Sequence, residues 1–245
     1  MRTILGMITL AALAACNSAQ SETAEVRVTQ AGSEGATATG DVTLEGFDQV
    51  ALRGPDNVEI TIGDAFSVRA EGPADVIELL EFELHGDRLE IGRKNERWNA
   101  NAPNGRATVH ITMPMIRGAS VAGSGDMTID RAEAEEFEAS VAGSGNIALG
   151  ELRATSVEFD IAGSGDIRAA GTASDIEIGI AGSGNVRAGD LRAQRIDIRV
   201  AGSGDIDGYA TERVDGNFIG SGDATIRGGA RCNARSIGSG SLRCS

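Results

Sequence analysis

The chain has 245 residues and a formal net charge of −14, with 22 basic against 36 acidic side chains. A surface this acidic repels nucleic acid and disfavours phosphate ligands, so no nucleic-acid partner is expected. Only 3% of the residues are aromatic, whereas 34 are glycine. Few large side chains are therefore available for a wide globular core, and an elongated, stacked architecture is expected.

The first fifteen residues have the composition of a secretory signal peptide. Arg2 supplies a positive charge, and residues 4–15 are mostly apolar, end in small side chains and are too few to span a bilayer permanently. The sequence Leu13-Ala14-Ala15-Cys16 resembles the bacterial lipobox, in which the cysteine becomes the lipidated first residue after cleavage. The alternative is an ordinary signal peptide that contains a cysteine. We therefore expect a signal peptide at 1–15 and a lipid anchor at Cys16.

The residue after that cysteine indicates where the protein goes. Asn17 stands where aspartate would favour retention at the inner membrane, so the lipobox resemblance implies a protein anchored in the outer membrane of the cell envelope, facing the periplasm or the outside. The membrane is then a partner through the lipid. Residues 16–40 are small and polar, and they predict a flexible tether between the anchor and the folded body.

Residues 41–116 predict a strand-rich region without an obvious repeat. Alternating apolar residues indicate strands at 47–52, 58–62, 66–70, 82–84, 88–91 and 107–112, with a weaker one at 26–28. Residues 73–80 form the one plausible helix, because Pro73 suits a first turn. A polar loop is expected at 94–105. We expect this region to cap or extend the repeats that follow it.

Residues 117–245 are built from one repeated phrase. A Gly-Ser-Gly core begins at Gly123, Gly143, Gly163, Gly182, Gly202, Gly220 and Gly238, with intervals of 20, 20, 19, 20, 18 and 18 residues. Apolar residues stand two, four and six positions before most of these glycines, which indicates a strand with one buried face. Four positions after the first glycine another apolar residue begins a second strand. The pattern predicts an all-β, right-handed parallel β-solenoid of about seven rungs of 18–20 residues.

One position after each phrase lies a column of aspartate and asparagine: Asp126, Asn146, Asp166, Asn185, Asp205 and Asp223. Stacked rungs bring such residues about 4.8 Å apart. We expect a structural Asx ladder, in which these side chains hydrogen-bond the corner backbone and one another. Alternation with asparagine separates most of the carboxylates by two rungs, too far to share one Ca²⁺. Only Asp205 and Asp223 are adjacent acids, so they are the one candidate calcium pair, and no other metal or cofactor is expected.

Two cysteines lie symmetrically around the last phrase. Cys232 stands six residues before Gly238 and Cys244 six after it. In several earlier rungs one of the two matching positions is bulky and the other small, as expected if they face each other across the core. An oxidising envelope permits a disulfide there, while two buried free thiols are the alternative.

A catalytic function is the competing hypothesis. Several β-solenoids are polysaccharide lyases or hydrolases, and Arg168, Arg187, Arg199 and Arg227 could act beside Asp166 or Asp205. The repeats contain no histidine or lysine, however, and Tyr209 is their one tyrosine or tryptophan for sugar stacking. His85 and His110 stand alone in the first region and are expected to be ordinary strand or turn residues. The similarity of the rungs to one another also argues against an enzyme, because a catalytic site should break their regularity.

These features together resemble a known family. The lipoprotein leader, Gly46-Phe47, the Ile-Thr-Met-Pro sequence at 111–114 and the tandem Ala-Gly-Ser-Gly-Asp/Asn units are similar to the head GIN domain family over roughly residues 47–242. Its members are described as auto-transporter adhesin-like proteins of bacterial envelopes. The resemblance implies a β-solenoid in the envelope and brings no catalytic residues.

Two functional hypotheses follow. The first is a non-enzymatic envelope lipoprotein that presents a rigid β-solenoid as a scaffold or adhesion surface to a protein or polysaccharide partner. The alternative is a carbohydrate-active β-solenoid enzyme acting on envelope or extracellular polysaccharide.

Overall fold

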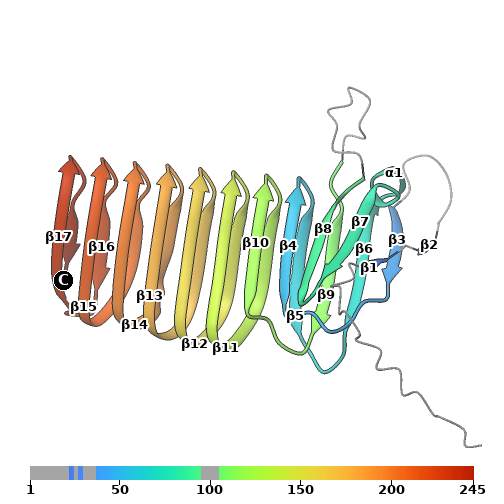
Figure 1. Cartoon of the computed structure of the whole chain (residues 1–245), viewed down its shortest axis with the longest axis horizontal. Coiled ribbons are helices and arrows are strands. Elements are labelled where there is room, and N and C mark those ends of the chain that lie inside the picture. Colours follow the sequence, from blue (N-terminus) through green and yellow to red (C-terminus); the bar gives the residue numbers. More distant parts are fainter. Residues whose placement is uncertain (1–21, 25–26, 30–36, 95–104) are drawn as a thin grey trace, which may run out of the picture.

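The structure is a computed structural model that describes residues 22–24, 27–29, 37–94 and 105–245. The strands join into one continuous hydrogen-bonded assembly that is long in one direction (Figure 1). Within the described ranges, no helix combines the length and the apolar character that a membrane crossing requires. The signal peptide predicted at 1–15 and the lipidation site at Cys16 lie outside these ranges.

The second half of the chain is a parallel β-solenoid, as the glycine period predicts. Its strands are β10 (Gly118–Gly123), β11 (Asp126–Gly143), β12 (Asn146–Gly163), β13 (Asp166–Gly182), β14 (Asn185–Gly202), β15 (Ile206–Gly220), β16 (Ala224–Arg227), β17 (Arg231–Gly238) and β18 (Leu242–Cys244). Each pairs in parallel with its equivalent one turn later, so that Gly143 lies beside Gly163 and Gly163 beside Gly182. The prediction of about seven rungs is corrected to about six turns, because seven corners enclose six complete turns between them.

The region before the repeats extends the same coil. It contains β4 (Gln49–Gly54), β5 (Asn57–Ile62), β6 (Ser67–Pro73), β7 (Leu80–His85), β8 (Arg88–Arg93) and β9 (Thr108–Met113). Gly54 pairs with Gly123, and Val58 pairs with Met127, so β4 and β5 form one more turn ahead of the first glycine phrase. β8 and β9 continue it in parallel. Beyond them β7 pairs antiparallel with β8, and β6 pairs antiparallel with β9, which ends the parallel stacking.

The N-terminal elements differ in part from the prediction. The helix expected at 73–80 is reduced to α1 (Ala74–Ile77), one turn that buries Val76 and Ile77. Three strands, β1 (Glu22–Ala24), β2 (Arg27–Thr29) and β3 (Thr37–Val42), lie in or overlap the segment expected to be a flexible tether. They pair antiparallel with β7, β3 and β6 respectively. The backbone of β3 pairs along β6 from Thr37 to Val42.

One core runs through the whole coil. The rung in β11 shows how it forms: its inward-facing residues are buried, and the residues between them are partly or fully exposed. The buried ones are Met127, Ile129, Ala132, Phe137, Ala139 and Val141. Pairs of consecutive exposed residues interrupt this alternation where the chain bends. Five phenylalanines are buried along the length of the molecule: Phe47, Phe82, Phe137, Phe159 and Phe218.

The glycine corners stack without any change of register, whereas the opposite side of the coil adjusts. In most corners the carbonyl oxygen of one glycine accepts two backbone N–H groups of the next rung, as Gly123 does from Ser144 and Gly145 at 2.8 and 3.0 Å. Gly182 and Gly202 each accept one, from Ser203 and Ser221, at 2.9 Å. Register shifts occur instead between Leu149 and Leu152, between Arg168 and Ala170, and between Ala188 and Arg192. Differences in rung length are therefore absorbed away from the corners.

Candidate functional site

The Asx side chains beside the corners hydrogen-bond from rung to rung. The Oδ1 atom of each member accepts the backbone N–H of the next, at 3.1 Å from Asn146 to Asp126 and at 3.0 Å from Asp166 to Asn146. The same contact recurs at Asn185, Asp205 and Asp223 and ends at Ser241. It also starts one rung earlier than the sequence suggested, because Asn57 accepts the N–H of Asp126 at 3.2 Å.

The alternation of aspartate and asparagine in this Asx ladder matches donors to acceptors. The Nδ2 atoms of Asn146 and Asn185 donate to Asp126 and Asp166 at 2.6 and 2.8 Å. At Asp166 burial acts to raise the pKa, but hydrogen bonds from Asn185 and Arg187 outweigh it and hold the pKa below its usual value. Each of these side chains therefore finds a hydrogen-bond partner on a neighbouring rung. No two carboxylates are adjacent in the ladder between Asp126 and Asn185.

In the candidate calcium pair, Asp205 and Asp223, one carboxylate oxygen of each residue already accepts hydrogen bonds within the ladder. Asp205 Oδ1 accepts the N–H of Asp223, and Asp223 Oδ1 accepts both the N–H and the hydroxyl of Ser241. The hydrogen bond from Ser241 lowers the pKa of Asp223. These contacts explain both aspartates as structural members of the ladder.

Cys232 and Cys244 form a disulfide, with Cα atoms 6.5 Å apart. The bond links β17 to β18 across the last turn. All eight residues of β17 are exposed, in contrast to the buried Val214 and Phe218 with which Cys232 and Ser236 pair on the preceding turn. The disulfide is therefore the covalent restraint on the turn that has the least packing.

Replacing both cysteines by serine should loosen this last turn. Closing a loop of this size contributes about 3 kcal/mol, and the loss should remain local because the inner rungs keep their neighbours on both sides. Amide hydrogen exchange is expected to accelerate at 231–244 and to stay unchanged in β11 and β12. Equal acceleration along the whole coil would contradict this prediction.

Three of the four arginines proposed for catalysis form ion pairs with different carboxylates. Arg187 contacts Asp166 at 2.6 Å, Arg227 contacts Asp207 at 3.4 Å, and Arg199 contacts Glu177. Arg168 is exposed. Tyr209 lies beneath Arg192, whose guanidinium carbon is 5.1 Å from the ring centre. Arg187, Arg199 and Arg227 therefore belong to separate ion pairs on outer faces and not to one enclosed site.

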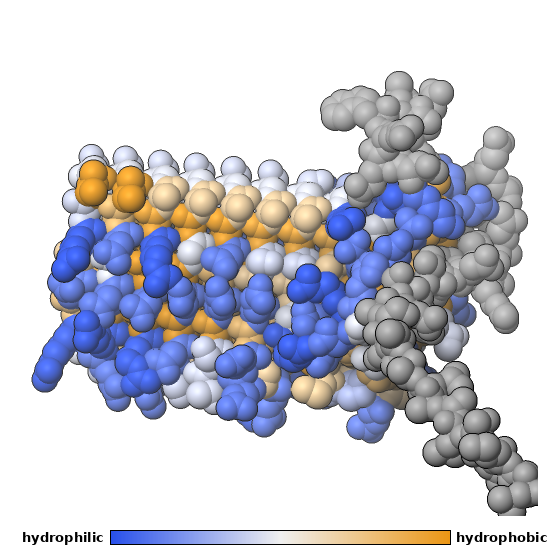
Figure 2. All heavy atoms as spheres, viewed as in Figure 1, coloured by the Kyte–Doolittle hydropathy of each residue, from blue (hydrophilic) through white to orange (hydrophobic). Residues whose placement is uncertain are grey.

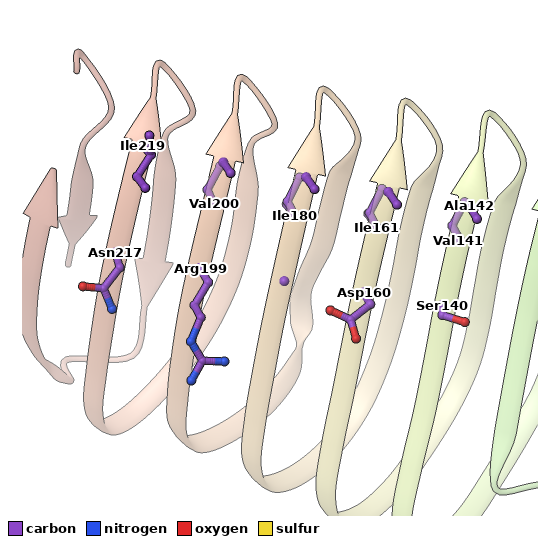
Figure 3. A pocket seen from close by; sticks show the side chains of 14 residues that line it. Ser140, Val141, Ala142, Asp160, Ile161, Ile180, Arg199, Val200, Asn217 and Ile219 are labelled. Carbon is purple, nitrogen blue, oxygen red and sulfur yellow. The ribbon is translucent and has the colours of Figure 1, made fainter. Parts of the chain in front are cut away.

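A shallow groove of about 640 Å³ crosses the outer face of the strands that precede the corners (Figure 3). Its apolar floor is an alanine column, one residue before each corner glycine, that ends in isoleucine: Ala142, Ala162, Ala181, Ala201 and Ile219. Ile219 and the next member, Ile237, are 60% and 74% exposed. Figure 2 shows the column as a pale orange row that turns deep orange toward the C-terminal end. Polar residues two positions earlier, among them Asp160, Arg199 and Asn217, border it.

A second column on the same face is acidic and was missed in the sequence. Its members stand five residues before successive corner glycines: Glu138, Glu158, Glu177, Asp197 and Asp215. Like charges stacked in register repel one another. Arg199 and Arg213 neutralise Glu177 and Asp215. Aligning the repeats on their outward positions, and not only on the inward ones, would have shown this acidic column.

The stacked negative charges of the acidic column affect the pKa of Glu158. Partial desolvation raises the pKa of its carboxyl, and the nearby carboxylates of Asp160 and Glu138 raise it further. A raised pKa in the folded state means that the contribution of this group to stability is greatest below the unfolded pKa and is lost as pH rises through the folded pKa.

The substitution Glu158→Gln should therefore stabilise the protein slightly at pH 7, by about 1 °C in Tm because the group is largely solvated. The gain should disappear near pH 4. Thermal unfolding at the two pH values tests this, with Glu133→Gln as a control that removes the same charge outside the column. A loss of stability at pH 7 would contradict the expectation.

Comparisons with known proteins agree with this architecture. The family model described as "Putative auto-transporter adhesin, head GIN domain" matches residues 46–230. A solved structure of a putative adhesin from Bacteroides fragilis covers 86% of this chain and 98% of its own, with a TM-score of 0.78 and 22% identity. A putative lipid binding protein from Parabacteroides distasonis covers 86% and 97%, with a TM-score of 0.68 and 23% identity.

A putative adhesin from Parabacteroides merdae covers 86% and 97%, with a TM-score of 0.69 and 16% identity. No curated protein matches the chain. The structural similarities establish the fold, and the family model spans well over half of the sequence. The chain therefore belongs to the head GIN domain family, whose adhesin-like β-solenoid supports a structural or binding role.

Proposed function

We propose that this protein is a non-enzymatic lipoprotein of the bacterial envelope that presents a rigid β-solenoid as an adhesion surface. The family description and the adhesin-like structural relatives support an envelope or surface role. The leader sequence and Cys16 supply the anchor. A lipid at the N-terminal end would leave the repeats free to extend away from the membrane.

The observation that carries the proposal is the groove on the outer sheet face. It spans five successive rungs, from Ser140 on β11 to Ile219 on β15, and offers the same apolar floor on each. Rungs stack about 4.8 Å apart, so a long partner would meet one equivalent contact per rung. Many individually weak contacts of this kind add up to strong attachment. A protein or polysaccharide segment laid along the coil fits this surface.

The binding surface can be tested by blocking the groove. The double variant Ala162→Lys and Ala201→Lys places long charged side chains on the alanine column at two exposed positions. The matched control, Thr128→Lys and Thr225→Lys, adds the same charge at exposed positions on the strands after the corners. Binding of purified protein to immobilised envelope proteins and polysaccharides should fall in the first variant only. Equal binding by both variants would overturn the assignment of the groove.

The lipid anchor, the cellular location and the absence of catalysis need separate experiments. Metabolic labelling with palmitate should mark the wild type and not Cys16→Ser, and protease treatment of intact cells should digest a surface-exposed protein. Protection of the protein from protease would argue against adhesion outside the cell. Release of sugars or unsaturated ends from any member of a polysaccharide panel would overturn the non-enzymatic proposal.

A further inference from the structure

We propose that Glu83, His85 and Glu90 form a binding site for a divalent transition metal ion with the ligand preference of Zn²⁺. The three residues belong to β7 and β8, strands that lie near the N-terminal end of the coil (Figure 1). Their ligand atoms all lie within 4.8 Å of one another. No other group of three such side chains converges in this way among residues 22–24, 27–29, 37–94 and 105–245. We call these three residues the Glu–His–Glu cluster.

The hairpin holds the cluster in place. Glu83 and Glu90 are directly opposite each other in the β7–β8 register, and His85 follows Glu83 on the same face of its strand. The alternate residues Phe82, Leu89 and Ile91 face inward and are fully buried. Because the buried face fixes both strands, only side-chain rotation is needed to bring the three ligand atoms to one ion.

The electrostatics of the cluster favour a cation. Two carboxylates placed opposite each other across antiparallel strands repel. In the structure each carboxylate contacts a different nitrogen-bearing side chain. His85 Nε2 is 3.0 Å from Glu83 Oε2, and Arg53 Nη1 is 2.9 Å from Glu90 Oε1. A divalent ion between the carboxylates would replace both contacts, accept the imidazole nitrogen as third ligand and keep a further position for water.

The donor set selects the kind of metal. One imidazole nitrogen with two carboxylate oxygens matches the ligands that Zn²⁺ takes in open protein sites. Ca²⁺ and Mg²⁺ prefer sites made of oxygen alone. Zn²⁺ is therefore expected to bind well before either of them.

The other histidine of the chain provides an internal contrast. His110 also stands between two glutamates, but its two ring nitrogens face different ones: Nδ1 is 3.1 Å from Glu59 and Nε2 is 3.8 Å from Glu71. The carboxylates therefore lie on opposite sides of the imidazole, and one ion could not contact all three groups. His110 is thus a matched control with the same residue types and a different geometry.

The experiment is a titration of the full chain carrying Cys16→Ser, so that no free thiol competes for the metal. Isothermal titration calorimetry with Zn²⁺ should show one site, and His85→Ala should weaken it by about tenfold or more. Glu90→Gln should weaken it too, whereas His110→Ala should bind like the parent. Ca²⁺ and Mg²⁺ should not compete at the same concentrations. Metal-free melting curves of the variants should coincide with the parent curve within about 1 °C, which would separate loss of ligand from loss of fold.

Because the chain has two histidines, imidazole ¹⁵N resonances give a second measurement. Zn²⁺ should shift the ring nitrogens of His85 and leave those of His110 unchanged. Binding that survives in His85→Ala, equal loss in His110→Ala, or shifts at both rings would overturn the proposal. So would the absence of any Zn²⁺ binding to the parent.

Discussion

Alanine at Gly163 is expected to lower the free energy of unfolding by about 4 kcal/mol or more, at the upper end for single substitutions. Gly163 has φ +138°, a sparsely populated conformation that costs a residue with a side chain about 1–3 kcal/mol. An added Cβ would also overlap the carbonyl oxygen of Gly143. That oxygen accepts the N–H groups of Ser164 and Gly165 at 2.8 and 3.1 Å. The overlap would therefore separate two rungs where their hydrogen bonds cannot be replaced.

Urea unfolding followed by circular dichroism measures the effect. The control is Gly229→Ala, because Gly229 also has a positive φ, +79°, but an added Cβ there would meet no atom within 4 Å. It should lose only the backbone contribution, about 1–2 kcal/mol. Similar losses in the two variants would mean that rung contact at the corner is unimportant.

Breaking the buried ion pair of Asp56 and Arg93 is expected to cost about 3–5 kcal/mol. Asp56 is the one buried charged or polar residue among the described residues, and its side chain is 1% exposed. Arg93 donates to both of its carboxylate oxygens at 2.6 and 2.7 Å and also to the carbonyl of Gly105 at 2.7 Å. The substitution Arg93→Met removes the partner of a buried charge and leaves that carboxylate with the N–H of Ala107.

The matched control is Arg153→Met. Arg153 contacts Glu151 at 2.6 Å, but the two side chains are 63% and 55% exposed. Exposed pairs contribute about 0–1 kcal/mol, so this variant should unfold close to the wild type. If Arg93→Met is as stable as Arg153→Met, the pair does not hold the first turn of the coil to the segment around Gly105.

The repeats could be predicted from sequence because the same residue pattern occurs in every rung. The glycines mark the corners, and apolar residues at every second position mark the buried face. A rung whose own pattern is weak can therefore be predicted from its alignment with the others. The turn formed by β4 and β5 escapes this pattern. Its corner has Pro55 and Asp56 where the repeats have serine and glycine, and its Asx residue, Asn57, does not follow the glycine phrase. Only the pairing of Gly54 with Gly123 reveals it.

The candidate surfaces were harder to predict for a different reason. Outward positions are free to vary, so the acidic column and the alanine column become visible only when register is known. The Glu–His–Glu cluster depends on the register of a hairpin: the sequence predicts strands at 82–84 and 88–91, but the opposition of Glu83 and Glu90 requires the pairing of the two strands. The strands β1 and β3 depend on tertiary pairing with β7 and β6, which local composition does not encode. β2, which pairs with β3, overlaps the weak strand predicted at 26–28.

The separation between unshifted corners and shifted bends has an evolutionary consequence. A residue can be gained or lost on the bend side, between Ala188 and Arg192 for example, without moving any glycine. Loops can therefore be inserted or deleted along the bend side of the coil, here called the seam, while the glycine corners on the opposite side keep their spacing. Diversification among relatives should concentrate on that seam, and it is also the place where a foreign peptide could be displayed at regular intervals.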